Sequence, residues 1–195
     1  KRLTHRILRS AGLKVPRQFE QVEPEDLEEI MRVCDRLVVK PARGEQGAGI
    51  SIDVHHPVEL IKAIQLAKTY CEDVIVEEYI EGQDLRIVVI DFQMVAAALR
   101  KPPCIVGTGS HTVGELIEKY NRRRLAATGG ESQVPLDGET ERCLKLMAYD
   151  YDTTLPAGTE VTVRKTANLH TGGTIHDVTD QIHPELVTAA EKASR

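Results

Sequence analysis

Two polar clusters in this chain of 195 residues combine residue types that bind phosphates. The first begins with Lys40, at the end of an apolar run, and continues through a glycine-rich segment at 43–49. Closely spaced glycines let backbone N–H groups converge on an anion, and a lysine supplies the counter-charge. No Gly-Lys-Ser/Thr follows the glycines, and Gln46 stands where a dinucleotide fingerprint has glycine. The spacing alone leaves two interpretations open, which are a flap over phosphates and a plain glycine hairpin.

The second cluster is acidic and ends another apolar run. Glu77 and Glu78 are followed by a glycine turn at Gly82 and a further acid, Asp84. Exposed backbone groups at such a turn can hydrogen-bond the edge of an adenine, and a carboxylate can accept from ribose hydroxyls. The alternative interpretation is a solvated acidic turn.

The helices and strands that must position these clusters are predicted from the periodicity of apolar residues and from proline and glycine, which mark their ends. Helices are expected over 1–11, from Pro24, from Pro57, from the capping box at Thr112 to about Tyr120, over 139–147 and from Pro184. Strands are expected over 36–40, 50–54, 74–80, 85–90, 94–99 and 159–164, with loops over 122–137 and 165–182. This mixture without repeats predicts an α+β fold of antiparallel sheets and packed helices.

Composition excludes several classes of protein. The net charge is −5, Trp is absent and aromatic residues make up 4%, which disfavours a nucleic-acid partner. The run Arg122-Arg123-Arg124 could bind an acidic substrate, a phosphate or a nucleic acid, although a solvated helix end is the simpler interpretation. No apolar run could cross a membrane, and the opening residues lack the pattern of a secretory signal. The four cysteines have no metal-type spacing, so we expect free thiols and a cytoplasmic protein.

Five segments in this order resemble the ATP-grasp superfamily of ligases: LTHRILRSAGLKVP, VVKPARGEQGAGI, VIVEEYIEGQDLRIVVI, MVAAALRKPPCIVGTGSHTVGELIE and VRKTANLHTGGTIHDVTDQIHPE. The later segments are most similar to the group of cyanophycin synthetases and bifunctional glutathione synthetases. The segment RRRLAATGGES resembles a segment of N-acetylglutaminylglutamine synthetases. The resemblance implies an ATP-grasp fold with a lead-in helix at 1–14, a small lobe with the flap at 15–83 and an incomplete C-terminal lobe at 84–195.

The resemblance also implies a reaction in which ATP converts a carboxylate into an acyl phosphate and an amine then forms an amide or peptide bond. By position, the residues implied to bind ATP are Lys1, Lys40, Gln46, Gly47, Gly49, Glu77, Glu78, Tyr79, Ile80 and Asp84. Among them Lys1 and Lys40 would bind phosphates, the flap glycines would cover them, Glu77 to Ile80 would hold adenine, and Asp84 would bind ribose. The residues implied to act on the transferred phosphate are Arg86, Arg100 and Asn168.

Magnesium is expected to bind together with ATP, but we predict none of its protein ligands within this chain. In the family an Asp on a core strand and a Glu-x-Asn pair follow the last helix, and we expect them beyond Arg195. The chain alone is therefore expected to be inactive. Its expected partners are ATP and small amino-acid or peptide substrates, without nucleic acid or membrane, and a homo-oligomer is left open. A non-catalytic nucleotide-binding module remains the alternative.

Overall fold

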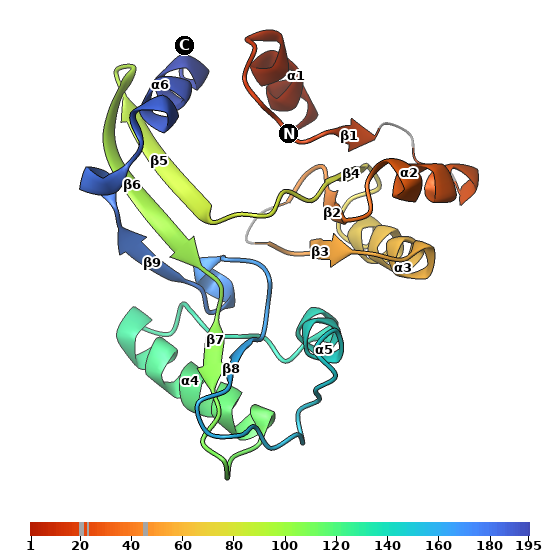
Figure 1. Cartoon of the computed structure of the whole chain (residues 1–195), viewed down its shortest axis with the longest axis vertical. Helices are drawn as coiled ribbons and strands as arrows, with labels where there is room; N and C mark the ends of the chain where they lie inside the picture. Colours follow the sequence, from red (N-terminus) through yellow and green to blue (C-terminus); the bar gives the residue numbers. More distant parts are fainter. Residues whose placement is uncertain (20–21, 23, 45–46) are drawn as a thin grey trace. The chain divides into compact units, whose positions relative to one another are not determined.

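The computed structural model describes residues 1–19, 22, 24–44 and 47–195, so Gln46 of the expected flap lies outside the described residues. The chain divides into two compact units. The first comprises residues Lys1–Gly82, Ile87–Ala97 and Val178–Arg195, and the second comprises Gln83–Arg86 and Ala98–Asp177. Figure 1 shows the order of the elements along the chain.

An antiparallel four-stranded sheet organises the first unit, with the strand order β1-β4-β2-β3. Its strands are β1 (Gln18–Phe19), β2 (Leu37–Pro41), β3 (Ser51–Val54) and β4 (Val74–Glu78). Leu37 and Val39 alternate with more exposed residues on β2 and pack with Val76 in the core. Successive side chains of a strand point to opposite faces, so Lys40 and Glu77 lie on the other face.

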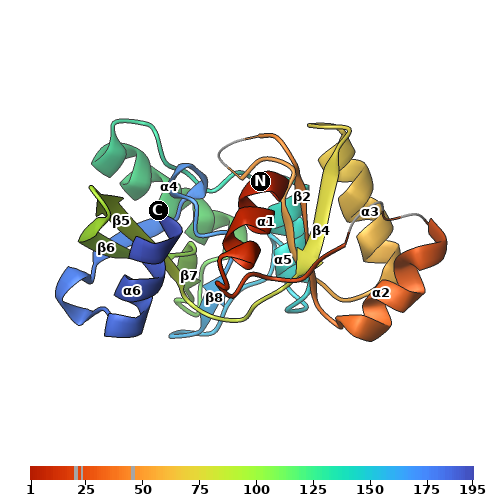
Figure 2. The same cartoon turned by 90° about the horizontal axis from the view of Figure 1, so that it is seen from above.

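Two helices cover the apolar face of this sheet (Figures 1 and 2). They are α2 (Leu27–Val33), which follows the 3-10 turn η1 (Pro24–Asp26), and α3 (Pro57–Lys68). The expected helix starts at Pro24 and Pro57 are confirmed, the first as a 3-10 turn. Leu27 and Leu60 contribute to the core from these helices.

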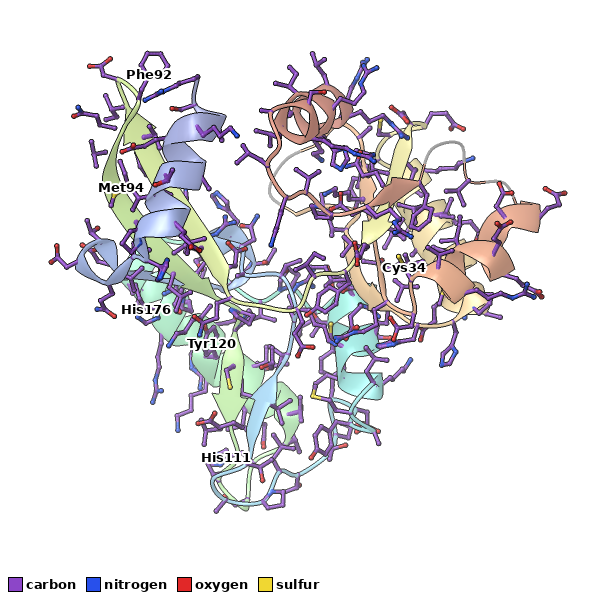
Figure 3. All side chains as sticks on the ribbon, turned by 45° about the horizontal axis from the view of Figure 1, so that its top comes forward. Cys34, Phe92, Met94, His111, Tyr120 and His176 are labelled. Carbon is purple, nitrogen blue, oxygen red and sulfur yellow. The ribbon has the colours of Figure 1, made fainter. Side chains whose placement is uncertain are left out.

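The rest of the first unit comprises helix α1, a β-hairpin and helix α6. Helix α1 (Arg2–Ser10) has no buried residue, and α6 (Pro184–Ala193) follows the 3-10 turn η3 (Thr179–Gln181). Strands β5 (Asp84–Ile90) and β6 (Gln93–Lys101) start or end in the second unit and meet at a two-residue turn, with Phe92 at its tip (Figure 3). Asp91 and Phe92 have φ values of 49° and 62°, as a type I′ turn requires. Glu191 of α6 accepts a hydrogen bond from the Met94 N–H at 3.1 Å.

The second unit has its own core between helices and short strands. Its elements are the end of β6 with β9 (Thr174–Asp177), the pair β7 (Cys104–Val106) and β8 (Glu160–Thr162), the helices α4 (Val113–Thr128) and α5 (Gly138–Lys145), and the 3-10 turn η2 (Leu169–Thr171). Leu144 of α5, Ile117 of α4 and Val161 of β8 are almost fully buried in this core.

The α+β class and the antiparallel pairing are confirmed, and the expectation of a loop at 122–137 is wrong over its first half. Helix α4 continues to Thr128 because the residues RRRLAAT mostly favour helix, and it ends where Gly129 adopts φ 63°. Strand β9 lies inside the expected loop at 165–182, and β7 was not predicted. No described helix is long and apolar enough to cross a bilayer.

Candidate functional site

An ion pair between Lys40 and Glu77 lies at the centre of the predicted phosphate and adenine residues of the first unit. Val38 on β2 is directly opposite Glu77 on β4, so Lys40, two residues further along, is a diagonal neighbour on the same face. Glu77 is 8% exposed, and its second oxygen accepts a hydrogen bond from Gln18 Nε2 at 3.0 Å. The carboxylate is thus fixed by two side chains from neighbouring strands.

Lys1 joins this pair from the start of the chain. Its Nζ donates a hydrogen bond to the Pro41 carbonyl at 2.7 Å. Burial, followed by the nearby Lys40 ammonium, lowers the pKa of Lys1 from its ordinary value of 10.5. Burial and the neighbouring Lys40 both disfavour the charged form of Lys1, so an added anion would stabilise its ammonium group.

The predicted hinge at Glu78, Tyr79 and Ile80 follows β4. The N–H groups of Glu78 and Tyr79 donate to the carbonyls of Arg17 and Arg36, at 2.8 and 3.0 Å. The Ile80 N–H has no acceptor among the residues that the structure describes, and the Ile80 side chain is 58% exposed. Of the three hinge residues, Ile80 therefore has the available backbone donor for a ligand.

The Arg36 side chain braces this hinge. Its guanidinium lies 4.3 Å from the centre of the Tyr79 ring, and its Nε is 2.5 Å from Oδ1 of the buried Asp53. Nη1 also pairs with Glu81 at 3.0 Å. Such a stacked arginine restricts the rotation of the ring and fixes the course of the chain.

The last glycine of the expected flap, Gly49, packs closely against Tyr70 and Pro41. Gly49 is buried with φ 68°, and a Cβ at this residue would lie 2.5 Å from the Tyr70 ring and 3.0 Å from Pro41. Gly47 lies half-buried in the same turn. Glycine is thus required at position 49 for packing as well as for conformation.

In the second unit, Asp84 and Arg100 bind each other. Arg100 donates from Nε to Oδ1 at 2.9 Å and from Nη2 to Oδ2 at 3.0 Å, the bidentate geometry of a strong ion pair. The sequence assigned these residues to different parts of ATP and did not predict their contact. Arg86, two residues after Asp84 on β5, is exposed and binds no other described residue.

Asn168 is the N-cap of η2 in the second unit. Its side-chain oxygen accepts from the His170 N–H at 2.8 Å, and its carbonyl accepts from the Gly173 N–H at 2.9 Å. The side-chain oxygen is thus used inside the turn, and the amide NH₂ group donates to none of the described residues.

No three His, Cys, Asp or Glu side chains within residues 1–19, 22, 24–44 and 47–195 converge as a metal centre would require. No metal-dependent step is assigned to the described residues. Of the acidic residues predicted to contact ATP, Glu77 and Asp84 are each paired with a cation.

Sequence reasoning missed several residues that support the candidate site. Gln18 was not predicted, because its contact with Glu77 depends on a strand pairing that sequence alone does not reveal. Tyr120 and Arg124 bind the turn after Asn168, at Gly172 and Gly173. A signal for them was available, because both follow the buried Leu116 of α4 at intervals of four residues.

Known proteins resemble this chain over almost its whole length. Residues 7–151 match the family model described as D-ala D-ala ligase C-terminus. Cyanophycin synthetase from Nostoc sp. is 38% identical over 98% of this chain and 22% of its own length. The glutathione biosynthesis bifunctional protein from Mannheimia succiniciproducens is 33% identical over 93% of this chain and 25% of its own length. The chain thus spans about a quarter of such curated relatives.

Solved structures agree in fold. A bifunctional glutathione synthetase from Pasteurella multocida matches 98% of this chain and 27% of its own, with a TM-score of 0.51 and 27% identity. A D-alanine–D-alanine ligase from Bacillus anthracis matches 100% of this chain and 45% of its own, with a TM-score of 0.55, and at 16% identity it supports the fold alone. From its sequence and its fold, the chain belongs to the ATP-grasp family of carboxylate–amine ligases.

Proposed function

We propose that this chain is the ATP-binding part of an ATP-dependent carboxylate–amine ligase. The observation that carries the proposal is the group of Lys1, Lys40 and Glu77 beside β2 and β4, where Lys40 pairs with the buried Glu77 carboxylate and the Lys1 ammonium, bound to the Pro41 carbonyl, lies within the electrostatic influence of Lys40. A phosphate would supply the missing negative charge, and a charge-assisted hydrogen bond is worth about 1.5–3 kcal/mol.

In the first unit, the acid and the hinge would hold the adenine. Glu77 would accept from the exocyclic amino group, and the free N–H of Ile80 would donate to a ring nitrogen. Both lysines would bind phosphate oxygens. To do so, Lys40 would give up its ion pair with Glu77 and bind a phosphate oxygen. Glu77 would then accept a hydrogen bond from the adenine amino group in place of Lys40.

In the second unit, Asp84 would accept from the ribose hydroxyls, and the arginines and Asn168 would act on the transferred phosphate. In the proposed reaction a substrate carboxylate oxygen attacks the γ-phosphorus, ADP leaves and an acyl phosphate forms. The amine then attacks the acyl carbon, loses its proton to a base and expels inorganic phosphate. Arg86 and Arg100 would stabilise the negative charge that develops in these steps.

For the product, we propose a small amidated peptide made from glutamine or a related amino acid, as in N-acetylglutaminylglutamine synthetases. The segment RRRLAATGGES supports this assignment by its resemblance to those ligases. A second candidate is a cyanophycin synthetase-like ligase, which the 38% identity with the Nostoc protein favours. A panel of amino acids and peptides titrated against the chain in the presence of a non-hydrolysable ATP analogue would separate the two candidates by which of them bind.

Calorimetric titration with ADP, AMP and a non-hydrolysable ATP analogue, with and without magnesium, tests the nucleotide site. We expect ADP to bind more tightly than AMP, and Lys40→Ala to weaken ADP binding by a factor of about 10–100, which corresponds to one lost charged hydrogen bond. Lys62→Ala, on an exposed position of α3, is the matched control and should bind as the wild type does. Equal affinities of Lys40→Ala and wild type would remove Lys40 from the site, and a wild type that binds no nucleotide would overturn the proposal.

A further inference from the structure

A row of α4 side chains binds the turn that carries Asn168. Tyr120 and Arg124 are four residues apart and share one side of the helix. The Tyr120 hydroxyl donates to the Gly172 carbonyl at 2.5 Å, and Arg124 Nη2 donates to the Gly173 carbonyl at 2.8 Å. Burial raises the pKa of Tyr120, so its hydroxyl stays protonated and remains a donor.

Arg124 also reaches the start of the turn through Ser132. Its Nε and Nη2 donate to Ser132 Oγ at 3.2 and 3.0 Å. Ser132 is 2% exposed, and its hydroxyl donates to the Leu169 carbonyl at 2.5 Å. One guanidinium therefore fixes both ends of the turn, Gly173 directly and Leu169 through one buried hydroxyl.

The neighbouring arginines of α4 do not share this role. Arg122 is exposed and lies 4.0 Å from Glu118 in an ion pair along the helix surface. Arg123 is exposed and has no partner among the described residues. Of the three arginines, Arg124 alone is partly buried, and its contacts are with backbone and hydroxyl oxygens instead of a carboxylate.

Arg124 acts on Asn168 through the backbone of the turn. The carbonyl of Asn168 accepts from the N–H groups of Thr171 and Gly173, at 3.2 and 2.9 Å, and its side-chain oxygen accepts from His170. When Leu169 and Gly173 are fixed, these bonds also fix the direction of the Asn168 side chain.

We propose that Arg124 is a positioning residue, which holds the turn at 168–173 so that the Asn168 amide can donate to a bound phosphate. This inference rests on the proposed function for the role of Asn168. A lysine cannot replace Arg124, because a single ammonium lacks the planar fork that reaches Ser132 and Gly173 together.

The test measures amide hydrogen exchange of residues 169–173 and the affinity for a non-hydrolysable ATP analogue in the same variants. We expect Arg124→Lys and Arg124→Ala to accelerate exchange at Thr171 and Gly173 by about tenfold or more, and to leave exchange in the sheet of the first unit unchanged. Arg122→Ala is the matched control from the same helix and should exchange as wild type does. Millimolar ethylguanidinium should restore slow exchange in Arg124→Ala and not change Arg122→Ala.

Titration with a non-hydrolysable ATP analogue, which retains the γ-phosphate, then separates this inference from the proposed function. Arg124→Lys should weaken binding of the analogue by about the factor that Asn168→Ala does, and the double variant should bind no more weakly than either single variant. If wild type binds the analogue while Arg124→Lys retains both its exchange rates and its affinity, the positioning role is overturned. If exchange accelerates but Arg124→Lys and Asn168→Ala bind the analogue as wild type does, Arg124 is only structural. A wild type that binds no nucleotide overturns the proposed function and this inference's phosphate role, whatever the exchange shows.

Discussion

At the scale of single residues, four charged groups of the predicted site form two ion pairs, Lys40 with Glu77 and Arg100 with Asp84. Lys40 could be predicted as a phosphate ligand because it ends a strand before a glycine-rich segment. Glu77 was also predicted as a site residue, but its pairing with Lys40 could not be predicted, because it depends on the register of β2 against β4. The same holds for Asp84 and Arg100, which lie on different strands. A nucleotide that binds these four groups would have to compete with the two ion pairs.

The lowered pKa of Lys1 predicts a pH dependence of nucleotide binding. A bound phosphate would raise this pKa again, so the complex holds the proton more tightly than the free chain does. ADP affinity should therefore be full below the lowered pKa and should fall as the pH rises through it towards 10.5. Calorimetry across the alkaline range below that value measures the loss.

Lys1→Arg is the control for this prediction, because a guanidinium stays charged throughout the range. Its ADP affinity should be less dependent on pH than that of wild type. If both proteins lose affinity to the same extent, Lys1 is not the titrating group.

At the scale of elements, the start of α4 could be predicted and its end could not. The pattern Thr112-x-x-Glu115 is a capping box, and the structure contains both of its bonds, from Glu115 N–H to the Thr112 hydroxyl at 3.2 Å and from Thr112 N–H to the Glu115 carboxylate at 2.8 Å. The end was misjudged because Arg122 to Arg124 resembled a surface loop. Strand β9 was missed because an exposed edge strand can be polar, as His176 and Asp177 are.

Removal of this cap should weaken the second unit. Thr112→Ala deletes the side-chain acceptor and should lower the free energy of unfolding by about 1 kcal/mol. Thr112→Ser keeps the hydroxyl and should lose much less. Urea unfolding of the three proteins, followed by circular dichroism, measures the difference. Equal losses in the two variants would show that the threonine methyl group matters, and not the cap.

The turn after η2 should tolerate no side chain at Gly172. This residue has φ 93°, and a Cβ would lie 2.6 Å from Val134 Cγ2 and 3.2 Å from its backbone nitrogen. Gly172→Ala therefore adds a steric clash to the cost of the left-handed conformation, which is about 1–2 kcal/mol for a residue with a side chain.

Gly130→Ala is a closely matched control, since Gly130 also has φ 93° but nothing lies within 4 Å of its added Cβ. We expect Gly130→Ala to lower the free energy of unfolding by the conformational cost alone, and Gly172→Ala to lower it by about 1–3 kcal/mol more. Thermal and urea unfolding of both variants measure the two losses. Similar losses would mean that Val134 moves aside at little cost.

At the scale of the whole molecule, the fold class follows from the order of the elements, but the way in which single strands divide between the two units does not. Strands β5 and β6 are continuous in sequence and in the sheet, yet each belongs partly to the first unit and partly to the second. A hydrophobic pattern describes one element at a time and cannot divide a strand in this way. The separate cores became visible only from the packing, in which Leu60 and Leu144 belong to different clusters of buried residues.

The two clusters of buried hydrophobic residues predict that a leucine-to-alanine substitution will increase local opening in a different part of the chain in each case. Leu60 and Leu144 are both fully buried, so Leu60→Ala and Leu144→Ala each remove the same atoms and should each cost about 2–5 kcal/mol. Because the clusters share no residue, Leu60→Ala should accelerate amide exchange first in β2 and β4, and Leu144→Ala first in α4 and β8. Exchange followed residue by residue by NMR measures both patterns in the intact chain. Acceleration of all these elements together in either variant would instead mean that the chain opens as one cooperative unit.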